Sequence, residues 1–190
     1  QHDLVARSKP VLDIGGFRFR DLNANGELDP YEDWRLPADA RAADLVGRMT
    51  LDEKAGAMLI ATNNPDCGGG ISAHGRQLIE KQKMTRFILR SKVVLSAPDC
   101  SIKLTGFALR GGYAQTPRQM ADYTNAVQAQ LEAARLGIPA LFKDNARNHV
   151  ETDGRAGIGA GAGILSEFPK EAGLAAAALG AGAPVDRQGS

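Results

Sequence analysis

A helix that leads directly into a buried strand is the feature that most constrains the fold of this chain. Thr116 and Gln119 form a capping-box pattern around Pro117, which occupies the first helical position. Apolar residues then recur every three or four positions up to Gly137, and the apolar segment 138–142 follows with almost no linker. This succession is typical of α/β architecture, so we predict an α/β fold with a strand over 138–142.

Other segments carry weaker signals of regular structure. Phe17 and Phe19 alternate with arginines, as in a short strand, and Thr50 with Glu53 has the form of a second capping box. We predict strands over 17–20, 58–60, 87–89, 93–95 and 138–142, helices over 39–48, 51–58, 117–134 and 170–179, and loops over 62–76 and 105–115.

Length and charge exclude several classes of protein. The chain has 190 residues, which suits one domain but falls short of a complete (β/α)₈ barrel of ~250 residues. No apolar run approaches the ~20 residues of a membrane span. Lys and Arg number 23 against 22 Asp and Glu, so the net charge of +1 does not indicate nucleic acid or an anionic membrane as a partner.

The segment from Asp21 to Glu32 matches the twelve-position calcium loop. Calcium prefers oxygen ligands, the glycine at position 6 permits the sharp turn, and a glutamate at position 12 can bind bidentately. An acidic solvated turn is the alternative. EF-hands come as helix–loop–helix pairs, whereas a strand-like segment precedes this single loop, so we expect a structural Ca²⁺ ion rather than a sensor. The predicted ligands are Asp21, Asn23, Asn25, Glu27 through its backbone carbonyl, Asp29 and Glu32, with Gly26 at the turn.

The two cysteines, Cys67 and Cys100, leave the redox compartment open. They form no CxxC pair and cannot make a zinc cluster alone, so one disulfide and two free thiols are both possible. The sequence begins with Gln1 and has no signal sequence, so we expect that a leader was removed or that the sequence starts late. With the calcium-type loop, this start is compatible with a secreted or periplasmic protein.

A polar cluster follows the predicted strand 138–142 and contains Asp144, Asn145 and Arg147. The carboxyl ends of parallel strands are where α/β proteins bind ligands, so this cluster is the candidate binding segment. His149 near two acidic residues is interpreted as a candidate dyad or as an ordinary loop hydrogen bond, and His74 as a surface loop residue. We assign no catalytic residue to this chain.

Four segments, in this order, resemble glycoside hydrolase family 3, the β-glucosidase family. The resemblance extends over about residues 17–180, with little of it between 62 and 115. The matching segments are Asp21–Arg35, Arg48–Met58, Tyr123–Phe142 and Phe168–Gly173.

The resemblance implies a (β/α)₈ catalytic domain that hydrolyses terminal β-D-glucosyl residues with retention of configuration. In such enzymes an aspartate forms a covalent glycosyl intermediate, and a glutamate, usually from a following domain, serves as acid and base. The family's nucleophile lies in a later strand than this chain reaches, so we expect an N-terminal part of the barrel that is inactive alone. The predicted divisions are a lead-in with the calcium-type loop (1–38), a partial barrel (39–180) and a frayed tail (181–190).

The same resemblance suggests how the chain would contact substrate. Counting from Ile138, Asn145 falls at the position of the family's first glucose-binding aspartate, Asp144 lies one residue earlier, and Arg147 would support them. The implied partners are a β-glucoside or oligosaccharide, the rest of the barrel and a following domain, with self-association possible and neither nucleic acid nor membrane involved. The alternative is a non-catalytic, calcium-stabilised module for carbohydrate binding or protein interaction.

Overall fold

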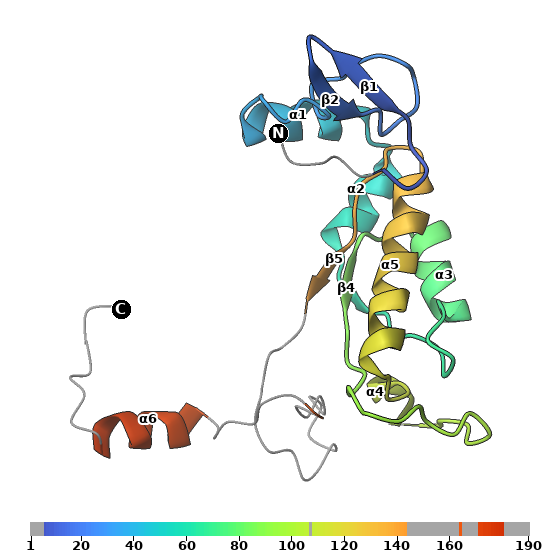
Figure 1. Ribbon diagram of the computed structural model, residues 1–190, viewed down its shortest axis with the longest axis vertical. Coiled ribbons are helices and arrows are strands. Elements are labelled where there is room, and N and C mark those ends of the chain that lie inside the picture. Colours follow the sequence, from blue (N-terminus) through green and yellow to red (C-terminus); the bar gives the residue numbers. More distant parts are fainter. Residues whose placement is uncertain (1–5, 107, 144–163, 165–170, 181–190) are drawn as a thin grey trace.

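The computed structural model describes residues 6–106, 108–143, 164 and 171–180, in which helices alternate with short strands (Figure 1). Among these residues, no helix combines the length and apolar character needed to span a membrane. The strands are β1 (Val11–Ile14), β2 (Phe17–Arg20), β3 (Ala61–Thr62), β4 (Arg86–Ile88) and β5 (Leu141–Lys143). The helices are α1 (Ala38–Arg48), α2 (Leu51–Met58), α3 (Ala73–Glu80), α4 (Ala108–Gly111), α5 (Pro117–Ala133) and α6 (Glu171–Gly180).

A parallel sheet with the order β3-β4-β5 forms the centre of the molecule. Its register pairs Phe87 with Ala61 on one side and with Phe142 on the other. Helix α3 connects β3 to β4, and helices α4 and α5 connect β4 to β5. Parallel strands that follow one another in sequence and in space, with helical crossovers, are α/β architecture. The predicted α/β class is therefore confirmed, and the barrel stays a proposal.

Helices α3 and α5 pack with the sheet around one apolar core (Figure 1). Tyr123, Val127 and Leu131 of α5 are buried at every fourth position and contact a cluster that includes Leu78 and Phe87. This spacing places all three side chains on one face of the helix. The apolar stripe predicted from the sequence is therefore the face that α5 buries.

The N-terminal hairpin of β1 and β2 packs on aromatic and cationic side chains. A turn at Gly15 and Gly16, both with positive φ, joins the antiparallel strands. Phe19 is fully buried and stacks on Trp34 with ring centroids 5.8 Å apart. The guanidinium of Arg35 lies 4.8 Å from the centroid of the Phe19 ring, within the range of a cation–π contact. The strand predicted over 17–20 is confirmed, and its partner β1 was not predicted.

Helix α2 begins with the predicted capping box and approaches the turn before β4 closely. The Thr50 hydroxyl accepts the Glu53 N–H at 3.2 Å, while the Glu53 carboxylate accepts the Thr50 N–H at 2.9 Å. A Cβ added at Gly56 would lie 2.4 Å from the carbonyl oxygens of Gln82 and Lys83. No side chain fits at that distance, so glycine permits this backbone contact.

Three predicted strands differ from the observed ones. Segment 58–60 forms no strand, because α2 runs to Met58 and β3 begins at Ala61. Segment 93–95 forms only an isolated bridge at Val93, since no neighbouring strand pairs with it along its length. The strand predicted over 138–142 is shorter and shifted to β5, after Pro139, which has no N–H to donate to a sheet.

Two predicted loops contain helices. Helix α3 begins inside segment 62–76, where the Ser72 hydroxyl accepts the Gly75 N–H at 3.0 Å as an N-cap. Helix α4 lies inside segment 105–115. Glycine and asparagine dominate the first of these segments and conceal its helix signal. His74 consequently lies in the first turn of a helix and not in a loop.

Candidate functional site

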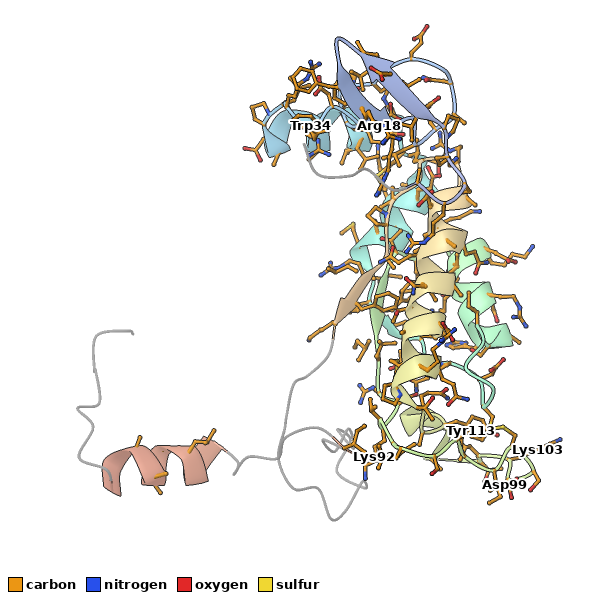
Figure 2. All side chains as sticks on the ribbon, in the orientation of Figure 1. Arg18, Trp34, Lys92, Asp99, Lys103 and Tyr113 are labelled. Carbon is orange, nitrogen blue, oxygen red and sulfur yellow. A yellow bond between two sulfur atoms is a disulfide. The ribbon has the colours of Figure 1, made fainter. Side chains whose placement is uncertain are left out.

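A cavity of about 510 Å³ opens at the carboxyl end of β3. One wall is the segment between β3 and the first turn of α3, and the other is the segment between Leu104 and Tyr113. This end of the molecule, which includes Tyr113, lies opposite the end that carries Arg18 and Trp34 (Figure 2). We call it the carboxyl-edge cavity; its lining residues are Thr62, Asn64, Pro65, Asp66, Ser72, His74, Leu104, Gly106, Gly112 and Tyr113.

A disulfide and a buried amide hold the two walls together. Cys67 and Cys100 are bonded, which resolves the alternative that the sequence left open. Gln115 is fully buried, and its side-chain N–H₂ donates to the carbonyl oxygens of Asp66 at 2.9 Å and of Tyr113 at 3.3 Å. One amide group therefore fixes the backbone of a residue in each wall.

Arg90, which follows β4, holds the end of β3 in place. Its backbone N–H donates to the Asn64 side-chain carbonyl at 2.8 Å, and its Nε donates to the Thr62 hydroxyl at 3.0 Å. The Tyr123 hydroxyl of α5 donates to the backbone carbonyl of Asn63, the residue after β3, at 2.6 Å. Burial of this hydroxyl raises the pKa of Tyr123. These contacts fix the backbone from which Asn64 and Asp66 extend.

The polar side chains of the cavity are suited to binding hydroxyl groups. Asp66 accepts the Gly70 N–H on Oδ1 at 2.7 Å, and Oδ2 has no hydrogen-bond partner among the described residues. The Tyr113 hydroxyl accepts the Leu104 N–H at 3.4 Å and can still donate its own proton. The His74 ring has no hydrogen-bond partner in the described part of the chain. A carboxylate, an imidazole and a phenol therefore offer both acceptors and donors.

The predicted substrate-binding residues lie outside the described residues. Asp144, Asn145 and Arg147 follow β5 directly in sequence, and so does His149. The structure therefore does not test these predictions. The cavity could not be identified from the sequence, because its residues come from two distant segments that only the sheet and the disulfide bring together.

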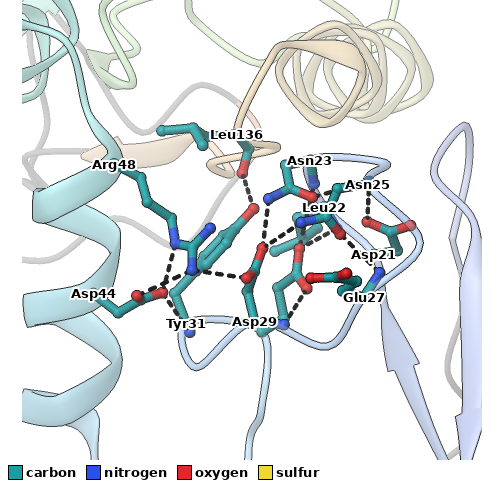
Figure 3. Close-up of polar contacts among 11 residues, drawn as sticks. Asp21, Leu22, Asn23, Asn25, Glu27, Asp29, Tyr31, Asp44, Arg48 and Leu136 are labelled. Carbon is teal, nitrogen blue, oxygen red and sulfur yellow. Dashed lines mark hydrogen bonds and ion pairs between the residues drawn. The ribbon is translucent and has the colours of Figure 1, made fainter.

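The twelve-residue loop folds around its own carboxylates (Figure 3). Asp21, which is 1% exposed, accepts the N–H groups of Asn25 at 3.0 Å and Gly26 at 2.8 Å. Glu32, which is 5% exposed, accepts the N–H groups of Leu22 at 2.7 Å and Asp29 at 3.1 Å. The first and last carboxylates of the loop therefore close its backbone.

The third buried carboxylate of the loop, Asp29, is neutralised by a cation of the protein itself. Its Oδ2 accepts the side-chain amides of Asn23 at 2.6 Å and Asn25 at 2.9 Å, and its Oδ1 pairs with Arg48 at 2.7 Å. Arg48 also bonds Asp44 at 2.8 Å, which lowers the pKa of that carboxyl. Arg48 was not among the residues predicted for this loop.

The oxygen ligands in this loop are of the kind that calcium prefers, but these oxygen atoms already accept hydrogen bonds or pair with Arg48. The structure brings the predicted ligands together, and Glu27 contributes an N–H bond to Asn25 at 2.8 Å. Within the described ranges, no three His, Cys, Asp or Glu side chains are grouped so as to hold a metal ion. Calcium therefore stays a prediction, and hydrogen bonds together with Arg48 account for the shape of the loop.

Sequence comparison relates the chain to glycosidases, although no family model matches it. It is 36% identical over 181 residues to a "Periplasmic beta-glucosidase/beta-xylosidase" of Dickeya chrysanthemi, a match that covers 91% of the chain and 24% of the relative. It is 30% identical over 158 residues to a "Probable beta-glucosidase C" of Aspergillus oryzae, a match that covers 80% of the chain and 21% of the relative. It is 31% identical over 160 residues to "Beta-glucosidase C" of Emericella nidulans, a match that covers 82% of the chain and 22% of the relative. The chain spans about a quarter of the length of these relatives.

Proposed function

We propose that this chain, which is similar to bacterial and fungal β-glucosidases, is the N-terminal part of the catalytic barrel of a glycoside hydrolase family 3 enzyme. The whole protein would hydrolyse terminal β-D-glucosyl residues, and β-xylosides are a second substrate class suggested by the name of the bacterial relative. The proposed reaction proceeds with retention, through an attacking carboxylate and a second carboxyl that protonates the departing oxygen.

The observation that carries this proposal is the parallel sheet with a cavity at the carboxyl end of β3 that carries the polar side chains of Asp66, His74 and Tyr113. Enzymes built on βα units bind their substrates at that end. The outer strands also lack neighbours among the described residues, and apolar side chains in them or next to them are exposed: Ile60, which precedes β3, to 40% and Leu141 of β5 to 57%. These edges support further strands of the barrel as the partner of this chain.

The roles of this chain would be to bind substrate and to complete the barrel. Asp144, Asn145 and Arg147, directly after β5, would hydrogen-bond sugar hydroxyls. The nucleophile and the acid/base would come from the rest of the protein. The 190-residue chain alone would therefore give no turnover.

The test is hydrolysis by the full-length protein that contains this chain. We expect cleavage of an aryl β-D-glucoside, with the β-anomer of glucose as the first product in a proton NMR time course. An aryl β-D-xyloside tests the second substrate class. Absence of cleavage of both substrates, or release of the α-anomer first, would contradict the proposal.

We also propose that the loop from Asp21 to Glu32 binds a structural Ca²⁺ ion, which the twelve-position pattern and its oxygen donors support. A ligand that binds only the folded state raises the melting temperature with its concentration. We therefore expect calcium to raise the melting temperature and excess chelator to lower it. An unchanged melting temperature would show that Arg48 and the hydrogen bonds of the loop suffice.

Location outside the cytoplasm is a further part of the proposal. The Cys67–Cys100 disulfide supports an oxidising compartment, and the bacterial relative is named as periplasmic. Fractionation of the source cells would place the protein in the periplasm or the medium. Recovery from the cytoplasm with both thiols free would contradict it.

A further inference from the structure

We propose that the carboxyl-edge cavity binds one neutral pyranose unit of the substrate through Asp66, His74 and Tyr113. The inference rests on the proposed glycosidase function and adds a sugar site that is separate in sequence from Asp144, Asn145 and Arg147. The position of the cavity, its charge, its apolar lining and the fixed backbone of its walls all support a sugar as its ligand.

The position of the cavity favours the substrate as its ligand. The cavity begins at Thr62, the last residue of β3, which pairs in register with Ile88 of β4. Ile88 in turn pairs with Lys143, the residue that precedes Asp144. Because parallel strands end at the same edge of a sheet, both candidate sugar-binding segments begin at this edge.

The charge of the cavity favours a neutral ligand rich in hydroxyl groups. Asp66 is the one carboxylate among its described lining residues, and no lysine or arginine is among them. The N-terminus of α3 also lines the cavity, but the side chains that bind phosphates and other anions are arginine and lysine, and the Asp66 carboxylate repels anions. A carboxylate oxygen with no protein partner, Oδ2 of Asp66, instead accepts a hydroxyl proton in a strong, charge-assisted bond.

The apolar part of the lining suits the carbon–hydrogen face of a sugar ring. Pro65 and Leu104 line the cavity together with the ring of Tyr113. Its volume of about 510 Å³ falls in the range of small-molecule sites, roughly 300–1,000 Å³. One pyranose ring therefore fits with space for water or for part of a neighbouring unit.

The walls of the cavity are held in place before a ligand arrives. The buried Gln115 amide bonds the backbone of both Asp66 and Tyr113, and the Cys67–Cys100 disulfide joins the loops next to them. Groups fixed in this way lose little conformational entropy on binding. The backbone that carries the Asp66 acceptor and the Tyr113 donor is therefore preorganised, and Gln115 is a positioning residue.

The experiment compares Asp66→Asn and His74→Gln with the wild type in the full-length protein. Binding of S-linked cellobiose, which cannot be hydrolysed, is measured by calorimetry, and KM and kcat are measured with cellotriose. Since each variant removes one polar contact, we expect the Kd and the KM to rise about tenfold for Asp66→Asn and severalfold for His74→Gln. We expect a smaller change in kcat.

Asp39→Asn is the matched control, because Asp39 is an exposed carboxylate in the first turn of α1. We expect wild-type binding and kinetics from it. Equal Kd values for wild type and for both cavity variants would overturn the sugar site while hydrolysis upheld the proposed function. Weaker binding by the cavity variants, in a protein that cleaves no β-glycoside, would uphold the sugar site and overturn the proposed function.

Discussion

The N-terminal region (residues 10–48) and the sheet region (residues 61–143) differ in how their polar groups are paired and their apolar side chains are buried. In the N-terminal region the carboxylates of Asp21 and Glu32 are buried, and each accepts backbone N–H groups of the same loop. In the sheet region the apolar core is closed by α3 and α5, but apolar side chains at its edges are exposed. The first region pairs its buried carboxylates internally, whereas the second leaves surfaces for a ligand and for further chain.

This difference shows which forces stabilise each region. Buried charges stabilise a fold only while their partners remain, so the N-terminal region depends on specific ion pairs and hydrogen bonds. The sheet region depends on apolar burial and on one covalent crosslink. Substitutions in the two regions should therefore differ in size and in their dependence on pH.

Phe87→Ala is expected to have the largest effect. The side chain is fully buried in β4, and its ring centroid lies 6.2 Å from that of Phe142. Truncating a buried phenylalanine costs about 3–5 kcal/mol, from lost burial and from the cavity left behind. Urea unfolding followed by circular dichroism measures this loss. Leu95→Ala, at a side chain that is 80% exposed, should change the free energy of unfolding by less than about 0.5 kcal/mol.

Removal of the disulfide is expected to have a slightly smaller effect, confined to the sheet region. The bond closes a segment in which the two cysteines are 33 residues apart, for which loop entropy gives about 3–4 kcal/mol of stabilisation. The double variant Cys67→Ala/Cys100→Ala should lower the free energy of unfolding by this amount, which urea unfolding measures. Reductant should destabilise the wild type and leave the double variant unchanged. A wild type with the same free energy of unfolding in the presence and absence of reductant would contradict the prediction.

Local sequence signals predicted the elements whose stabilising contacts lie close in sequence. Helix α5 combines a capping box, a proline at its first position and an apolar stripe, and all three occur in the structure. The twelve-position pattern likewise predicted that Asp21, Asn25 and Glu32 would gather in one loop. Glycine at position 6 allows this turn, because Gly26 has a φ of +82°.

Contacts between distant segments could not be predicted in this way. The spacing of Cys67 and Cys100 does not indicate that the loops carrying them are adjacent. Arg48 reaches Asp29 from the end of α1, and nothing in the loop pattern points to that arginine. The cavity depends on the same kind of contact, because the β3–β4 pairing and Gln115 bring Asp66 near Tyr113.

Arg48→Met tests the dependence of the N-terminal region on its internal cation. The substitution keeps an apolar stem but leaves Asp29 buried without its charged partner, so we expect a loss of about 1.5–3 kcal/mol. Arg118→Met is the matched control, since Arg118 forms an exposed pair with Asp122 on α5. Exposed pairs of this kind contribute little to stability, so we expect a much smaller loss from this variant. Equal losses from both variants in urea unfolding would contradict a special role for Arg48.

The same comparison can be repeated with Asp29→Asn. This variant removes the negative charge with which Arg48 pairs, so no carboxylate stays buried without a charged partner. Its loss of unfolding free energy should therefore be smaller than that of Arg48→Met. If Asp29→Asn costs more, the carboxylate contributes more through its bonds to Asn23 and Asn25 than through Arg48.

Glu53→Gln is expected to have the smallest effect, and one that depends on pH. Glu53 of α2 bonds Arg135 beyond the end of α5 at 3.1 Å, and this contact lowers its pKa below the ordinary value of 4.5. A lowered pKa gives stability that is fully present above 4.5 and is lost as the pH falls through the folded-state pKa.

Glutamine keeps the capping box and removes only the charge, so the variant should be less stable than the wild type by about 1 kcal/mol at neutral pH. The difference should shrink as the solution is acidified through the titration of Glu53. Urea unfolding at neutral and at acid pH measures both values, with the exposed neighbour Asp52→Asn as the control. A difference that is the same at both pH values would show that the contact between α2 and Arg135 stabilises through packing and not through the charge of Glu53.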